Sequence, residues 1–122
     1  MIVIGDKLIP FEEFFKINST NDIKNTKANS TVLFNYSDEI AKFCFENEIS
    51  FAIVVDSIKE AVYSSNLNAK YIITNKELSK ELQKIADNYM YDAKILAIIE
   101  SSDEFEEIAK AQIDGVIFKN LI

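Results

Sequence analysis

The chain has 122 residues, 48% of them apolar, and a formal net charge of −7. Its length and composition predict one globular domain over residues 1–122, and its acidic balance argues against nucleic acid or an anionic membrane surface as partner, because both attract basic surfaces. Histidine and arginine are absent and Cys44 is the only cysteine, which excludes Ser-His or Cys-His nucleophile pairs and zinc sites built from histidines or several thiolates.

The first part of the chain, residues 1–30, is expected to be an appendage to the domain. Ile2–Ile4 and Lys7–Ile9 flank Gly5-Asp6, and glycine at the first central position suits the type II′ turn of a tight β-hairpin. Asn18–Ser30 is rich in Asn, Ser and Thr and is interpreted as a polar connector. The segment therefore predicts an N-terminal hairpin that packs on the rest of the domain.

Residues 31–122 alternate short apolar runs with stretches of helical length and periodicity. Each run is apolar at consecutive positions, which is typical of strands buried on both faces. Strands of this kind, separated by helices, pair in parallel through right-handed crossovers. The runs are Thr31–Phe34, Phe51–Val55, Tyr71–Ile73, Ile95–Ile99 and Val116–Phe118.

The starts of three predicted helices carry the capping-box pattern, in which a hydroxyl caps one backbone N–H and a glutamate reaches back to another. The pattern occurs at Ser57–Glu60, Thr74–Glu77 and Ser101–Glu104. Each box directly follows an apolar run, so the loops from strand to helix are expected to be very short.

These elements predict an α/β three-layer sandwich with a five-stranded, mostly parallel sheet and the added N-terminal β-hairpin. The favoured strand order is the flavodoxin- or receiver-like 2-1-3-4-5, with helices on both faces of the sheet. The alternative is half of a (βα)₈ barrel, in which the same repeated units curl into a sheet with its helices outside.

Ligands of parallel α/β sheets bind outside the carboxyl ends of the strands. The polar residues expected there are Asn35, Asp56, Thr74, Asn75, Glu100, Ser101 and Lys119. Asp56 and Glu100 could hold Mg²⁺ weakly through carboxylate oxygens, and Lys119 could orient an anion. The other interpretation is that these residues only end strands and cap helices. Phosphate loops need several glycines and the chain has only two, so no cofactor is expected.

Two local resemblances to known families bear on this rim. The first is to (βα)₈ barrels of the pyruvate and phosphoenolpyruvate type, and it covers Lys94–Glu100, Phe105–Ile108 and Asp114–Ile117. It implies that Glu100, at a strand end, is a metal ligand. Lys119 and Asn120 stand where that family has an arginine and an aspartate, and we do not assign the chain to it.

The second resemblance is to phosphoacceptor receiver domains, which also have five strands. Ser101 and Lys119 match the switch hydroxyl and the lysine of that family. Thr74 and Asn75 stand where it has the phosphoacceptor aspartate, so phosphorylation of that kind is not expected. We do not assign the chain to this family either.

The predicted function is a small protein that acts through protein contacts without catalysis, with self-association first. A small-ligand-binding protein or Mg-dependent enzyme with its site at the strand ends is the alternative. The single cysteine and an N-terminus without a basic leader predict a cytoplasmic location.

A homodimer is expected because a sheet of order 2-1-3-4-5 normally ends in a helix, and only a few residues follow the last strand. One side of Val116–Phe118 would then lack cover. The N-terminal phenylalanines Phe11, Phe14 and Phe15, a second subunit, or both together would supply it.

Overall fold

All five predicted strands form, and every strand pair in the protein is parallel. The computed structural model describes residues 1–122. The five strands are β3 (Thr31–Asn35), β4 (Phe51–Val54), β5 (Tyr71–Thr74), β6 (Lys94–Ile99) and β7 (Gly115–Phe118). The helices between them are α1 (Asp38–Glu46), α2 (Ile58–Asn66), α3 (Lys76–Tyr89) and α4 (Phe105–Lys110), with a 3-10 turn at Ser102–Glu104 before α4. No helix is both long and apolar enough to cross a membrane.

The predicted N-terminal hairpin is wrong. Strand β1 (Ile2–Ile4) pairs in parallel with β7, and β2 (Phe14–Lys16) pairs in parallel with β3, so the sheet has seven strands. Gly5, at a φ of +108°, turns the chain as a hairpin would. The Asp6 carboxylate then accepts a hydrogen bond from the Leu8 N–H at 2.8 Å, which ties that N–H into a local turn. The segment after Gly5 therefore forms no strand beside β1.

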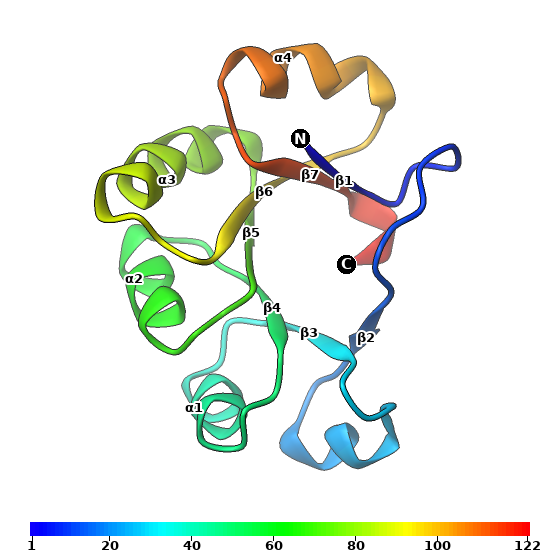
Figure 1. Cartoon of the computed structure of the whole chain (residues 1–122), viewed down its shortest axis with the longest axis vertical. Helices are drawn as coiled ribbons and strands as arrows, with labels where there is room; N and C mark the ends of the chain where they lie inside the picture. The colour runs from blue at the N-terminus through cyan, green and yellow to red at the C-terminus, as the bar shows by residue number, and fades with distance from the viewer.

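The predicted five-stranded sheet of order 2-1-3-4-5 is also wrong. The order is β1-β7-β6-β5-β4-β3-β2, in which β3 to β7 are neighbours in chain order. Successive right-handed crossovers in one direction place every helix on the same face. Figure 1 shows the result, a curled sheet with α1 to α4 around its outside. This agrees with the half-barrel alternative and not with a three-layer sandwich.

Because the sheet is curled, its outer and inner faces are buried in different ways. The outer face packs on the helices in a cluster of 21 buried residues that includes Cys44. The inner face packs on itself through Ile4, Leu33, Ala52, Tyr71, Ile73, Leu96 and Ile117. Both faces are thus buried without a second layer of helices.

The expected uncovered side of the last strand does not exist. Val116 lies in the outer cluster and Ile117 in the inner one, and both are fully buried within the single chain. The Phe118 ring packs edge-on against Phe105, with 6.2 Å between ring centroids. An uncovered last strand is therefore no longer a reason to expect a homodimer. The oligomeric state itself stays a prediction.

Candidate functional site

The predicted strand-end residues lie at one edge of the sheet, and two of them, Glu100 and Lys119, form an ion pair. Glu100 and Lys119, at the ends of the adjacent strands β6 and β7, approach to 3.8 Å, and both side chains are largely exposed. Asp56 follows β4, and β5 lies between β4 and β6. Two strand spacings then separate the backbones at Asp56 and Glu100 by about 10 Å. No three acidic or cysteine side chains gather as a metal site.

The other predicted rim residues differ in exposure. Asn35, Asn75 and Ser101 are exposed at the ends of their strands. Thr74 is buried, and its hydroxyl donates to the Val55 carbonyl at 2.9 Å. The predicted cap at Thr74 is therefore wrong, and the Asn75 side chain caps α3 instead, its Oδ1 accepting from the Leu78 N–H at 2.8 Å.

Two glutamates in the first turns of helices close the strand-end loops. Glu60 accepts from the Asp56 N–H at 2.8 Å, and Glu104 accepts from the Glu100 N–H at 2.7 Å. Glu104 also pairs with Lys76 at 2.6 Å, and this bond with the backbone donors lowers the pKa of Glu104 to about 2. These contacts support the interpretation that the residues at the strand ends serve to end strands and to begin helices.

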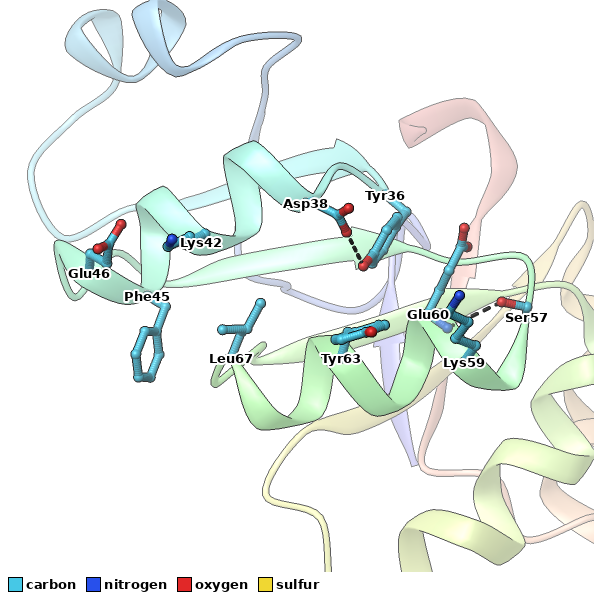
Figure 2. Close-up of a pocket in the computed structure, with 10 residues that line it drawn as sticks. All are labelled: Tyr36, Asp38, Lys42, Phe45, Glu46, Ser57, Lys59, Glu60, Tyr63 and Leu67. Carbon is cyan, nitrogen blue, oxygen red and sulfur yellow. Dashed lines mark hydrogen bonds between the residues drawn. The ribbon is translucent and has the colours of Figure 1, made fainter.

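A groove on the helical side of the protein is lined by residues that lie apart in the sequence. This α1–α2 groove has a volume of about 590 Å³ and lies between those two helices (Figure 2). It is lined by Tyr36, Asp38, Lys42, Phe45, Glu46, Ser57, Lys59, Glu60, Tyr63 and Leu67. Tyr36 directly follows β3 and Ser57 is the third residue after β4, so one end of the groove lies beside the carboxyl ends of those strands.

Both ends of the α1–α2 groove carry an aromatic ring together with charged side chains. Figure 2 shows Phe45 with Lys42 and Glu46 toward one end, and Tyr36 with Asp38 toward the other. The Tyr36 hydroxyl donates to the Asp38 carboxylate, and burial together with this bond raises the pKa of Tyr36 to about 12. Tyr63 lies between the two ends. The groove is therefore amphipathic along its length.

A second groove lies on the opposite side of α2, between α2 and α3. This α2–α3 groove has a volume of about 880 Å³, and its lining includes Val62, Tyr89, Met90 and Tyr91. The Tyr89 and Met90 side chains are 70% and 84% exposed. Helix α2 thus stands as a ridge between two grooves.

Helical periodicity gave one signal for these surfaces. Phe45 and Tyr63 depart from the apolar stripes of their helices, and Tyr91 departs from the stripe of the helical pattern expected over residues 76–91, which marks all three as candidates for an exposed patch. The structure places Phe45 and Tyr63 in the α1–α2 groove and Tyr91 in the α2–α3 groove. Their distribution over two grooves required the tertiary structure.

Cys44 is not part of either groove's chemistry. It is fully buried in the outer core, and burial raises the pKa of its thiol to about 11. A protonated, enclosed thiol is a poor nucleophile, which fits its interpretation as a structural residue.

The chain matches no protein-family model, and no curated protein shows significant sequence similarity to it. The residues and geometry described above are therefore the basis for the function proposed below.

Proposed function

We propose that this protein is a self-associating module, and that the α1–α2 groove is its contact surface. The observation that carries the proposal is the pair of aromatic side chains from adjacent helices in one groove. Phe45 is 44% exposed and Tyr63 is 53% exposed. Half-exposed aromatic side chains beside a cavity are the typical anchors of protein interfaces.

The shape of this surface suits a second copy of the chain. Lys59, Val62, Tyr63 and Asn66 are all exposed on α2, and their i, i+3, i+4, i+7 spacing places them on one face of the helix. A two-fold dimer requires a self-complementary patch. An α2 ridge that fits the α1–α2 groove of its partner, and receives the partner's ridge in its own groove, meets this requirement.

The charge of the surface also permits self-association. The groove is lined by two lysines and three carboxylates, so it carries little of the net charge of −7. A standard interface buries about 800 Å² per partner, which is roughly a tenth of the 7393 Å² accessible surface of the chain. Two neighbouring helices with their flanking grooves are large enough to supply that area.

Sedimentation velocity over a concentration series tests the proposal. We expect a species of twice the 13.9 kDa chain mass, and a dimer dissociation constant about 30-fold weaker in the double variant Phe45→Ala, Tyr63→Ala, as for loss of two interface anchors. Phe11→Ala is the matched control, because Phe11 is 43% exposed but lies outside the groove. A monomer at every concentration, or a dimer insensitive to the double variant, would refute the proposal.

Binding of a small ligand at the Tyr36 end of the same groove is the second candidate. The observation that favours it is the position of Tyr36 and Ser57 in the loops that follow two strands, where parallel α/β sheets bind ligands. A thermal-shift screen with Mg²⁺ and phosphorylated metabolites tests it, since a bound ligand raises the melting temperature by mass action. A hit must be weakened by Tyr36→Phe or Ser57→Ala, and a hit unaffected by both would exclude this site.

A further inference from the structure

The outward sides of α1, α2 and α3 carry most of the exposed apolar side chains of the protein. Figure 1 shows that these three helices follow one another around the outside of the sheet. Six of the ten large apolar side chains that are exposed lie on them or at their ends, and none lies on α4. The six are Phe45, Ile58, Val62, Tyr63, Tyr89 and Met90. This apolar surface is wider than the α1–α2 groove and includes both grooves beside α2.

The α2–α3 groove has the composition of the centre of a protein interface. Asp92 is the only charged residue in its lining, although charged residues make up 27% of the chain. Tyrosine and methionine are enriched at interface centres and charged residues are depleted there, and Tyr89, Met90 and Tyr91 all line this groove. Two copies that each carry a net charge of −7 repel one another. They are therefore expected to meet at a surface that holds few charges.

The symmetry of the proposed dimer decides which element lies over this groove. Helices that connect parallel strands through crossovers of one hand run parallel to one another, so α1, α2 and α3 form a row. When the α2 ridge of each copy enters the α1–α2 groove of the other with the helices aligned, the two-fold axis runs parallel to the helices and reverses the order of the row. Each α2 is then flanked by the partner's α2 on one side and by the partner's α1 on the other. The partner's α1 therefore lies over the α2–α3 groove.

The ends of the helices also match along this axis. α1, α2 and α3 each end five positions before the next strand begins, at Glu46, Asn66 and Tyr89. A rotation about an axis parallel to the helices keeps each residue at its level along them. The last turns of the partner's α1, with Phe45 and the exposed Lys42 and Glu46, thus reach the level of Tyr89. Lys42 and Glu46 have opposite charges, so together they bring no net charge into the groove.

We propose that the α2–α3 groove is the second half of the self-association surface and receives helix α1 of a second copy of this chain. The inference rests on the proposed function, because it describes the same dimer. Across the interface the helices lie in the order α3, α1, α2, α2, α1, α3, with successive helices taken alternately from the two copies. Both grooves of each copy are then filled, and Tyr89 packs against the last turns of the partner's α1.

Sedimentation velocity of a Tyr89→Ala variant tests the energetic part of the proposal. We expect the dimer dissociation constant to be about tenfold weaker, as for the loss of one aromatic anchor. Because Tyr89 is 70% exposed, the circular dichroism spectrum and the urea midpoint should change little. Phe11→Ala is again the control, since Phe11 lines neither groove. A Tyr89→Ala dimer as tight as that of the parent chain would overturn the proposal.

Thiol cross-linking tests the arrangement of the helices. Glu46→Cys and Asn88→Cys each place one reactive thiol at an exposed position near the end of α1 or α3, while the native Cys44 is fully buried. A short bis-maleimide should join the two variants into a covalent dimer when they are mixed, because α1 of one copy lies beside α3 of the other. Glu106→Cys, an exposed glutamate on α4, is the matched control for Glu46→Cys and should give no such product.

The outcomes distinguish this proposal from the proposed function. A dimer that is weakened by the double variant Phe45→Ala, Tyr63→Ala but not by Tyr89→Ala would overturn the α2–α3 contact and leave the α1–α2 groove as the interface. A covalent dimer formed by Glu46→Cys alone and not by the mixture would place the two α1 helices side by side and would also overturn it. A monomer at every concentration would overturn both proposals.

Discussion

Replacement of Gly115 by alanine should strain the pairing of β1 with β7. Gly115 pairs with Ile2 across the β1–β7 ladder. A Cβ atom at this position would lie 2.5 Å from the Ile2 carbonyl oxygen, 2.7 Å from the Ile2 Cβ and 2.8 Å from the Leu96 Cδ2. The Ile2 backbone cannot simply move away, because its N–H donates to the Asp114 carbonyl at 2.9 Å. Close approach of β1, and not a special φ, is the reason for glycine here.

Two routes bound the cost of the Gly115→Ala substitution. If β1 stays paired, overpacking of a buried site costs about 1–3 kcal/mol. If β1 detaches, exposure of Ile4 costs about 1.5–3 kcal/mol and the lost backbone hydrogen bonds about 1 kcal/mol each. Keeping β1 paired is the cheaper route, so we expect a loss of about 1–3 kcal/mol in the free energy of unfolding.

Urea unfolding followed by far-ultraviolet circular dichroism measures this loss. With a slope of about 2 kcal/mol per molar urea, the midpoint should fall by about 1 M. Native-state hydrogen exchange should accelerate at Ile2–Ile4 before it changes in β4 or β5, because the perturbation begins at the edge. A Gly115→Ala variant within about 0.5 kcal/mol of the parent chain would refute the close-approach reasoning.

Three further predictions concern the helices and the buried thiol. Met90→Gly should stabilise the chain by about 0.5–1 kcal/mol in urea unfolding, because Met90 ends α3 at a φ of 53° with an exposed side chain. Equal or lower stability would contradict the backbone argument. Lys76→Met should lower stability at neutral pH, with a difference that shrinks as pH falls from about 4.5 toward 2, because the pKa of Glu104 is lowered from 4.5 to about 2 and its stabilising effect is lost on protonation. A difference that does not vary with pH would exclude this ion pair as its cause. Native Cys44 should react with a thiol-specific disulfide reagent only as fast as the chain opens, because the thiol is fully buried and burial raises its pKa to about 11. Complete labelling of the native chain before any unfolding would contradict this.

The apolar runs and their helix starts were predictable because both are local properties. Phe51–Val55 and Ile95–Ile99 are apolar at consecutive positions, and both became strands buried on two faces. Ser57 and Ser101 were predicted as caps and do accept backbone hydrogen bonds at the starts of their helical segments. Thr74 was mistaken for a cap, because the neighbouring Asn75 competes for the same role.

The candidate grooves were only partly predictable. The departure of Phe45 and Tyr63 from their helical stripes follows from periodicity within one helix. Their convergence depends on α1 and α2 being neighbours on the outside of a curled sheet. The sequence placed Asp56 and Glu100 after apolar runs, but only the structure shows that β5 lies between their strands.

By itself, the sequence determined that the strands are parallel, that both faces are buried, and where each βα unit begins. Strand order was decided only in the tertiary structure. A flat sheet with helices on two faces and a curled sheet with helices on one face bury the same runs, and they require the same periodicity and caps. The two arrangements differ in whether successive crossovers keep one direction and in the edges to which β1 and β2 add. Both features depend on contacts between residues that are far apart in the chain, such as Ile2 and Gly115.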